Sequence, residues 1–392
     1  MSLMLDVGTD VPRIPDLNVG RDTYLLKLSD ELVRNRDAVL ARVLNAVESQ
    51  EMAPYYRYLT QNFGIPRDDG LLTKLEEANK RQLALFEDQL KVAEANEGEL
   101  EVQDALVARA NYLCQIGEKD PALDALELSI SKAVGMGSKL DGVFTIIRLG
   151  FFWNDSSLCR KNLERAAEMV EKGGDWERRN RLRVYRAYFC LSIREFEEAS
   201  ELFLSTLATF TSLELFSFDK FVFYAVIACM TCLERPNIKS KLLGAPEVQT
   251  VCAISPVLSQ YLNSFYNLQY CDFFSALVKI LDELRCDQIF ASHFSFYSRC
   301  IRLRTYSQFL SSYRSVSLSS MAESFGVSVP FLDKELSTFI AAGRLPAKID
   351  KVSGVVVTDR LERRNAQYQV ALKKGDALLN RIQKLAYAVI EA

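Results

Sequence analysis

The sequence has a single histidine, His293, and this scarcity limits the chemistry that the chain can perform. Serine and cysteine hydrolases use a histidine as general base, and many zinc sites use two or more histidines. A zinc site built on two histidines within the chain is therefore excluded. Because His293 lies among aromatic residues in "FASHFSFYSRC", we expect a packed or capping side chain rather than a catalytic base.

A long uninterrupted apolar segment is also lacking. The longest run, "FVFYAVIACMTCL" at 221–233, has 13 residues, whereas a membrane-spanning helix needs about 20. We expect this run to be a buried helix and expect no membrane partner. The first residues, "MSLMLDVGTDVPRIPDL", have neither the basic start nor the apolar run of a secretory signal, so they are expected to form a flexible lead-in.

An excess of charge of either sign is lacking as well. The chain has 48 basic and 51 acidic residues and a net charge of −3, so no overall field attracts nucleic acid. Nine cysteines at irregular spacing predict free thiols in a reducing compartment. Cys229 and Cys232 form a lone C-x-x-C pair in an apolar run, which is typical of core residues. We therefore expect no metal site, no cofactor and no catalytic residues.

Over most of residues 1–310, apolar residues recur three or four positions apart, which is the periodicity of a helix. The segment "RANYLCQIGEKDPALDAL" at 109–126 aligns with "RAYFCLSIREFEEASELF" at 186–203, and a weaker copy, "RLGFFWNDSSLCRKNLERA", lies between them. Aligned small residues such as Ala110 and Ala187 indicate places where helices cross closely. The pattern predicts helical hairpins similar to tetratricopeptide (TPR) repeats, whose usual period is about 34 residues. Such hairpins stack and present an extended surface.

Residues 317–359 predict a helix, a turn, a second helix and a hairpin, which is the outline of a winged helix. Ser320 and Glu323 form a capping-box pattern for the first helix, and Gly326 ends it. A second helix is expected after Ser328. The strings "AKID", "KVSG" and "VVVTD" then predict two short strands joined by a turn.

The second helix of this motif has the wrong charge for reading DNA. A DNA-reading helix offers Arg, Lys, Asn or Gln to base edges and phosphates. This helix offers Asp333, Lys334 and Glu335. We therefore expect the winged helix to contact protein or to serve an architectural purpose.

Three arginines fall on one stripe of a helix in "GGDWERRNRLRVYRAYF", beside its apolar face: Arg179, Arg183 and Arg186. They could bind RNA phosphates. Nearby glutamates, including Glu195 and Glu198, could instead satisfy them within or between subunits. The interpretation that we favour is a salt-bridged surface that binds a protein partner, and RNA binding is the alternative.

Acidic residues are dense around "NEGEL" at 96–100, and Glu87, Asp88, Glu101 and Asp104 flank this string. The pattern indicates an exposed turn between helices. A solvated face is favoured over an ion site.

Residues 365–392 predict one long helix with an apolar stripe. Its members recur three or four residues apart and include Leu378, Leu379, Ile382, Leu385 and Val389. Because no other part of the chain is expected to cover this stripe, we expect it to bundle with helices of other chains.

Helical repeats that lead into a winged helix and a long final helix resemble the organisation of PCI proteins. This module is shared by the proteasome lid, the COP9 signalosome and translation initiation factor three. Strings such as "GGDWERRNRLRVYRA", "SSYRSVSL", "MAESFGVSVPFLDKELSTFIAAGRL" and "KKGDALLNRIQKL" resemble in particular a proteasome lid subunit whose repeat arm precedes its PCI module.

The resemblance implies a mainly α fold, with a TPR-like helical-repeat solenoid followed by a PCI winged-helix module, a small β wing and a long C-terminal helix. The expected segments are an N-terminal tail and helical arm (1–100), TPR-like repeats (101–214), the helical part of the PCI domain (215–310), its winged-helix part (311–359) and a C-terminal bundle helix (360–392).

The resemblance also implies a non-catalytic scaffold in a cytoplasmic and nuclear hetero-oligomer with other PCI lid subunits and base subunits. Deubiquitination in this family belongs to a different subunit, whose metal site has two histidines. Winged helices of the family pair edge to edge, so Val355, Val356 and Val357 are the expected partner-binding strand. The alternatives are a PCI scaffold of the COP9 signalosome or of translation initiation factor three, or an RNA-binding PCI protein.

Overall fold

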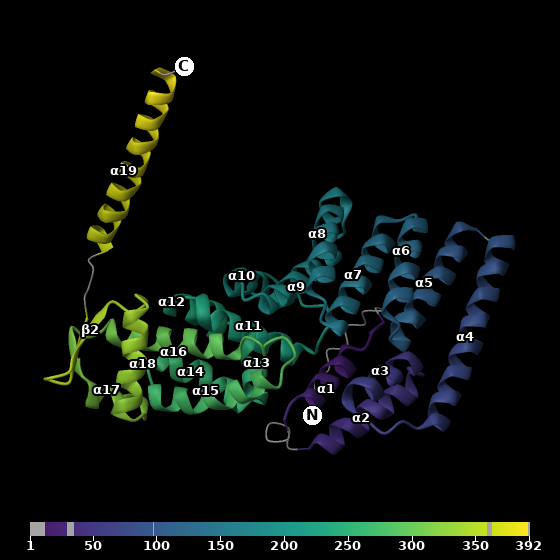
Figure 1. Ribbon diagram of the computed structural model, residues 1–392, viewed down its shortest axis with the longest axis horizontal. Helices are drawn as coiled ribbons and strands as arrows, with labels where there is room; N and C mark the ends of the chain where they lie inside the picture. Colours follow the sequence, from purple (N-terminus) through teal and green to yellow (C-terminus); the bar gives the residue numbers. More distant parts are fainter. Residues whose placement is uncertain (1–11, 30–34, 97, 359–362, 391–392) are drawn as a thin grey trace. The chain divides into compact units, whose positions relative to one another are not determined.

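The computed structural model describes residues 12–29, 35–96, 98–358 and 363–390, and most of these residues are helical (Figure 1). The elements in chain order are α1 (Leu17–Lys27), α2 (Arg36–Ser49), α3 (Ala53–Phe63), α4 (Asp69–Asn96), α5 (Glu99–Ile116), α6 (Lys119–Lys132), α7 (Met136–Trp153), α8 (Ser156–Gly173), α9 (Trp176–Ser192), α10 (Phe196–Thr206), the 3₁₀ turn η1 (Leu207–Thr209), α11 (Phe218–Cys232), α12 (Arg235–Ile238), the π turn η2 (Lys239–Leu243), α13 (Pro246–Ile254), α14 (Pro256–Asn267), α15 (Tyr270–Arg285), α16 (Phe294–Leu310), β1 (Ser315–Ser317), α17 (Leu318–Phe325), α18 (Val329–Ala341), β2 (Ala347–Asp350), β3 (Val355–Thr358) and α19 (Arg363–Ile390).

The chain forms two compact units. The first contains the described residues up to 266 together with 275–298, and the second contains 267–274 together with the described residues from 299 onward. The boundaries fall at the last residue of α14 and within helices α15 and α16. No helix in the described ranges is both long and apolar enough to cross a lipid bilayer. The apolar run at 221–233 lies almost entirely in α11, most of which is buried, as its sequence predicts.

Three consecutive helical hairpins occupy the centre of the first unit: α5 with α6, α7 with α8, and α9 with α10 (Figure 1). Four alanines at aligned positions of the first and third hairpins are completely buried: Ala110, Ala122, Ala187 and Ala199. Small side chains allow the helices of a hairpin to approach closely. The TPR-like repeat predicted from the sequence is therefore confirmed.

In each hairpin the first helix is followed closely by a residue with a positive φ. These residues are Gly117 (φ 80°), Asn154 (φ 55°) and Arg194 (φ 69°). A left-handed residue lets the chain leave a helix and turn back, and glycine adopts this conformation without a steric penalty. Asparagine tolerates it, whereas for arginine it costs about 1–2 kcal/mol. Arg194 therefore carries local strain in the third turn.

The winged helix of the second unit follows the predicted order of elements with one correction. Gly326 ends α17 in the left-handed conformation, and α18 begins directly after Ser328, as predicted. The cap of α17 is Ser317 and not Ser320, because the Ser317 hydroxyl oxygen accepts a hydrogen bond from the Ser320 backbone N–H at 3.3 Å.

The wing is a three-stranded antiparallel sheet in the order β1-β3-β2. β2 and β3 are the predicted hairpin, and β1 is a third strand that the sequence did not signal. Val316 of β1 and Ile349 of β2 both pair with Val356 of β3, whose side chain is completely buried. It belongs to the core of this unit together with Tyr306, Phe325, Leu332, Leu336 and Phe339.

Candidate interaction surfaces

The strand predicted to pair with a partner is not at an edge of the sheet. β3 lies between β1 and β2, so hydrogen bonds to neighbouring strands occupy both of its sides. The expectation that Val355, Val356 and Val357 form an exposed edge is therefore wrong. Within the described sheet, the outer strands are β1 and β2. A charge at Val356 would disrupt the core before it could test any interface.

The acidic residues of α18 bind within their own unit. Glu335 Oε1 lies 2.8 Å from Arg302 Nε of α16. The Tyr306 hydroxyl donates a hydrogen bond to Glu335 Oε2 at 2.6 Å. Burial and this hydrogen bond raise the pKa of Tyr306, so the phenol stays protonated. Asp333 pairs with Lys351 of the wing at 3.3 Å. These contacts give α18 an architectural role within the second unit.

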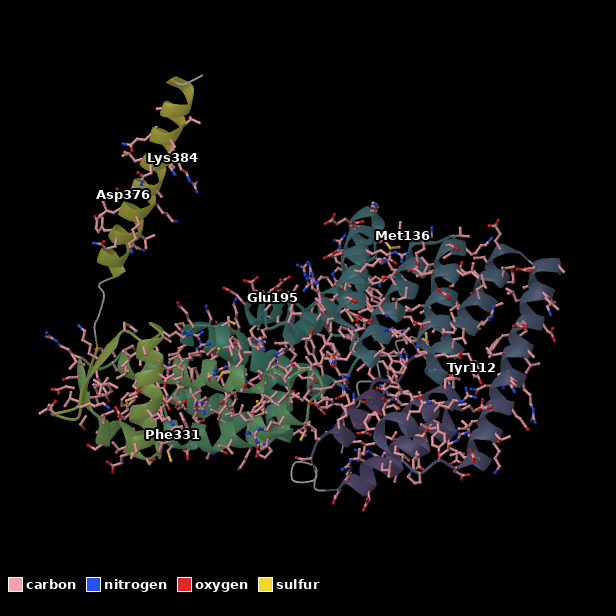
Figure 2. The ribbon with its side chains drawn as sticks, in the orientation of Figure 1. Tyr112, Met136, Glu195, Phe331, Asp376 and Lys384 are labelled. Atoms are coloured by element: carbon pink, nitrogen blue, oxygen red, sulfur yellow. The ribbon has the colours of Figure 1, made fainter. Side chains whose placement is uncertain are left out.

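The apolar stripe of α19 is exposed where its side chains are described. Leu378, Leu379, Ile382 and Leu385 are each between 57% and 67% exposed. The side chain of Val389 lies outside the described residues. Asp376 and Lys384 project from the same helix (Figure 2). Exposure of several large apolar side chains on one helix is typical of a surface that another helix covers.

The apolar surface of α19 begins earlier than the sequence analysis placed it. Tyr368, Val370 and Leu372 are also at least half exposed. Leu372 and Leu379 are seven residues apart, which is two turns of a helix. This spacing indicates in the sequence that Leu372 belongs to the same apolar stripe as Leu379, but the glycine at 375 interrupts the pattern between them.

The three arginines of the predicted stripe are exposed on α9, but only one of them has an acidic partner among the described residues. Arg186 pairs with Glu198 of α10 at 2.5 Å, as one of the expected glutamate contacts. Among the residues that the structure describes, the guanidinium groups of Arg179 and Arg183 have neither a hydrogen-bond nor an ion-pair partner. Trp176, which the sequence analysis missed, is 64% exposed and lies one helical turn before Arg179. Tryptophan and arginine are enriched among residues that dominate binding energies at interfaces.

A buried ionic cluster lies beside this surface and holds α9 in place. Arg181 Nε donates to Glu214 Oε1 at 3.1 Å, and the Tyr185 hydroxyl donates to the same oxygen at 3.1 Å. Arg148 of α7 donates to the Tyr185 hydroxyl at 3.0 Å. Burial raises the pKa of Tyr185. All four side chains are buried, so we assign the cluster a structural role.

His293 is occupied by contacts within the first unit. Its Nδ1 accepts a hydrogen bond from Arg194 Nε at 2.8 Å. Its Nε2 lies 2.6 Å from the carbonyl oxygen of Ser192, so this nitrogen carries the proton and donates. The two bonds attach the α9–α10 turn to the loop before α16. This geometry agrees with the packed histidine that its sequence context predicts.

All nine cysteines are free thiols, as predicted. Across the described residues, one group has the spacing that could hold a metal ion: Cys190, Glu195 and Glu198 (Glu195 is labelled in Figure 2). Arg186 already neutralises Glu198. Burial raises the pKa of Cys190 to about 12, which keeps the thiol protonated. Since a metal ligand must be a thiolate, the group is a poor metal site.

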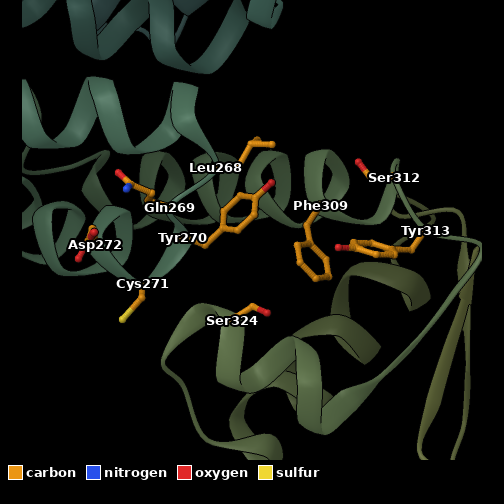
Figure 3. Close-up of a pocket in the computed structure, with 9 residues that line it drawn as sticks. All are labelled: Leu268, Gln269, Tyr270, Cys271, Asp272, Phe309, Ser312, Tyr313 and Ser324. Atoms are coloured by element: carbon orange, nitrogen blue, oxygen red, sulfur yellow. The ribbon is translucent and has the colours of Figure 1, made fainter.

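A hollow of about 370 Å³ in the second unit lies between the start of α15, the end of α16 and α17 (Figure 3). Tyr270 and Phe309 form its aromatic wall, with ring centres 5.5 Å apart. Cys271, Asp272 and Ser324 also line it. Its lining contains neither histidine nor a pair of carboxylates, so it does not provide an acid and a base for catalysis.

Comparison with known families and proteins gives matches along the chain. The family described as 26S proteasome subunit RPN7 matches residues 68–241. The PCI domain family matches 277–360, and the family described as 26S proteasome regulatory subunit RPN7/PSMD6 C-terminal helix matches 367–389.

Individual relatives match over very different lengths. The 26S proteasome non-ATPase regulatory subunit 6 homolog of Arabidopsis thaliana is 42% identical over 385 residues, which cover 98% of this chain and 100% of the relative. Subunit 6 of Dictyostelium discoideum is 40% identical over 379 residues, with 97% and 98% covered. The COP9 signalosome complex subunit 1b of Drosophila melanogaster is 25% identical over 162 residues, with 41% and 31% covered.

Proposed function

Because the chain belongs to the 26S proteasome subunit RPN7 family, we propose that it is a non-catalytic structural subunit of the proteasome lid. In this role it organises assembly of the regulatory particle, which serves the degradation of ubiquitinated proteins. The nearly complete alignment with regulatory subunit 6 proteins supports this function over a role in the signalosome, whose subunit 1b aligns over less than half of the chain.

The observation that carries the proposal is the exposed apolar stripe of α19, which lies within the segment matched by the RPN7/PSMD6 C-terminal helix family. Complete burial of one large apolar side chain contributes about 1.5–3 kcal/mol. A helix with several such side chains in water therefore has a strong tendency to join a bundle. We propose that the covering helices belong to other PCI subunits of the lid.

The remaining partner assignments follow from the same role. Other lid subunits and base subunits are the proposed partners, and nucleic acid and membranes are not. Arg179 and Arg183, beside Trp176, are proposed to bind a protein partner. We propose a cytoplasmic and nuclear location. His293 supports the absence of catalysis, because both of its ring nitrogens are engaged by protein groups.

The test is to tag the chain at its N-terminus in its own cells and to purify its complexes gently with ATP present. Peptidase activity of the bound material is measured, and its components are quantified by mass spectrometry. We expect proteasomal activity with lid and base subunits in nearly equal amounts. An inactive preparation rich in signalosome subunits, initiation-factor subunits or RNA-bound proteins would contradict the proposal. The assignment of the PCI fold would be unaffected.

A further inference from the structure

A groove of about 530 Å³ runs between the second half of α4 and the first half of α5, in the first unit. Leu85 and Val92 line it from α4, and Ala105 and Ala108 line it from α5. Leu85 and Val92 are seven residues apart, about two helical turns, so they lie on the same face of α4. The small alanines leave the space that makes this seam hollow. The groove is therefore a feature of the two helix faces and not of a loop.

The apolar side chains of the groove are not needed to hold α4 against α5. The core face of α4 already packs on α5, where Phe86 meets Tyr112 with ring centres 5.5 Å apart (Tyr112 is labelled in Figure 2). Ala93, seven residues after Phe86, is buried as well, and it lines the groove where the two helices meet. Leu85 and Val92 nevertheless remain 55% and 51% exposed. This second apolar stripe is unexplained by the fold of the unit.

The groove is acidic around its apolar floor. Asp88, Glu101 and Asp104 line it, and its lining contains no basic side chain. Glu101 lies in the first turn of α5, where the helix dipole favours an acid. Asp88 and Asp104 lie beyond the first turns of their helices. Asp88 pairs with exposed Lys91 at 3.3 Å, whereas Glu101 and Asp104 have no basic partner among the side chains that the structure describes.

A metal ion does not explain these acids. The carboxylates of the groove do not converge to the spacing of metal ligands, which in the described part of the chain occurs only at Cys190, Glu195 and Glu198. An apolar floor is also unsuited to a hydrated cation. The lining of the groove therefore fits a ligand with both apolar and basic groups better than an ion. Glu97 of the "NEGEL" string lies outside the described residues.

We propose that the groove binds an amphipathic helix whose apolar stripe is flanked by lysine or arginine, supplied by another component of the assembly. The distance along α4 from Leu85 to Val92 is about 10 Å, which accommodates two turns of such a helix. Its apolar residues contact Leu85, Val92 and the alanines, and its basic residues pair with Asp88, Glu101 and Asp104. The inference deepens the proposed scaffold function and rests on it.

The test places a photo-crosslinking amino acid, p-benzoylphenylalanine, at Leu85 or Val92 of the full chain within the purified assembly. The control position is Leu128 on α6, an exposed leucine outside the groove. We expect adducts from 85 and 92 to map to one segment of another subunit, with apolar residues three or four apart and a net positive charge. The control position should give no adduct with that segment.

Charge reversal then tests the acidic rim. Glu101→Lys together with Asp104→Lys should lower the adduct yield about fivefold or more. The matched control is Glu164→Lys together with Glu168→Lys, which changes the net charge equally at exposed positions of α8. Circular dichroism confirms that both variants keep their helices.

Three outcomes would overturn the inference: an equal yield from the two charge-reversed variants, an adduct with an acidic or neutral segment, and an adduct with residues 367–389 of a copy of this chain. An absence of adducts in a particle that has incorporated the chain would also refute the groove and leave the scaffold function intact. Failure of the unaltered chain to enter the particle would instead refute the scaffold function.

Discussion

Asp155 shows how one residue connects two helical hairpins. Its Oδ1 accepts hydrogen bonds from the backbone N–H groups of Ser157 at 3.2 Å and Leu158 at 3.1 Å, which caps α8. Its Oδ2 accepts a hydrogen bond from Lys119 Nζ, 2.8 Å away. The Ser157 hydroxyl also donates to Oδ1, at 2.7 Å. The bond from Lys119, followed by those from the Ser157 hydroxyl and the Leu158 N–H, holds the pKa of this carboxyl well below its ordinary value. Asp155 therefore stabilises the folded chain in its ionised form.

We predict that Asp155→Asn lowers the free energy of unfolding by about 1 kcal/mol at pH 7. The folded-state pKa is depressed, so the contribution is complete above the ordinary carboxyl pKa of about 4 and declines as the pH falls below it. Urea denaturation at pH 7 and near pH 3 should show the difference between variant and wild type shrinking in acid. Asp175→Asn is the control, because Asp175 precedes α9 without a capping bond from its side chain. A difference independent of pH would contradict this account.

Glu214 is the residue on which the buried cluster depends. Glu214→Ala would leave Arg181 with one remaining acidic partner, Asp141, at 3.2 Å. We predict a loss of about 3 kcal/mol in the free energy of unfolding, since an incompletely paired buried charge is costly. Glu127→Ala is the matched control, because it removes the exposed partner of Arg165, and it should cost less than about 1 kcal/mol. Equal losses in denaturation experiments would show that the cluster is not tightly coupled.

At the scale of the elements, the hairpin turns determine how the repeats stack. Gly117 is left-handed, and a Cβ atom at this position would lie 2.9 Å from Cβ of Tyr55. Gly64 is also left-handed, but nothing lies within 4 Å of a Cβ atom there. The two glycines therefore share a conformational constraint and differ in the close approach of a neighbour.

We predict that Gly117→Ala destabilises the chain by about 2–3 kcal/mol and Gly64→Ala by about 1 kcal/mol. The shared part is the strain of a left-handed alanine, and the difference is the contact with Tyr55. Thermal and urea unfolding of the two variants provide the measurement. If Gly64→Ala were as costly as Gly117→Ala, the close approach of Tyr55 would contribute nothing.

Helices were predictable from the sequence because their signals are local and repeated. The hairpins were found from alanines spaced 77 residues apart, and α18 from Ser328 and its apolar spacing. β1 was missed, because three residues of the sequence "SVS" carry too little apolar alternation to indicate a strand. Without β1, the hairpin appeared to have a free edge at Val355–Val357. Strand order depends on contacts between distant residues, which a local pattern does not contain.

The candidate surfaces were predictable to different degrees. The stripe of α19 repeats every three or four residues, so it was found, apart from its start near Tyr368. The pairing of Arg186 with Glu198 was among the expected contacts, but Trp176 was missed because one exposed aromatic residue has no periodic signal. The groove was missed because Leu85 and Val92 resemble core residues until the structure shows that the half-buried Phe86 packs on Tyr112 of α5 and that they remain exposed.

At the scale of the whole molecule, folding and assembly depend on different residues. The core of the second unit is formed by buried residues such as Leu332 and Val356. The apolar residues of α19 contribute exposed surface instead. Variants of α19 should therefore separate the ability to assemble from the ability to fold.

We predict that Leu379→Asp together with Ile382→Asp prevents incorporation into the assembly without changing the unfolding midpoint by more than 1–2 °C, because neither side chain is buried. The matched control is Asn380→Asp with Gln383→Asp, at exposed positions one residue further along the helix. Co-purification and thermal unfolding measure the two effects. Normal incorporation of the Leu379 and Ile382 variant would contradict the bundle.

The exposure of α19 also gives the chain a built-in reporter of assembly. All side chains described between Gln367 and Ala386 are exposed, so in the free chain the backbone amides of this helix are protected from hydrogen exchange by little more than the helix itself. Burial in a bundle would couple their opening to dissociation of the partners. Deuterium uptake over these residues therefore reports, without an attached probe, what fraction of the molecules is free or assembled. The rate at which protection from exchange appears measures the rate of assembly.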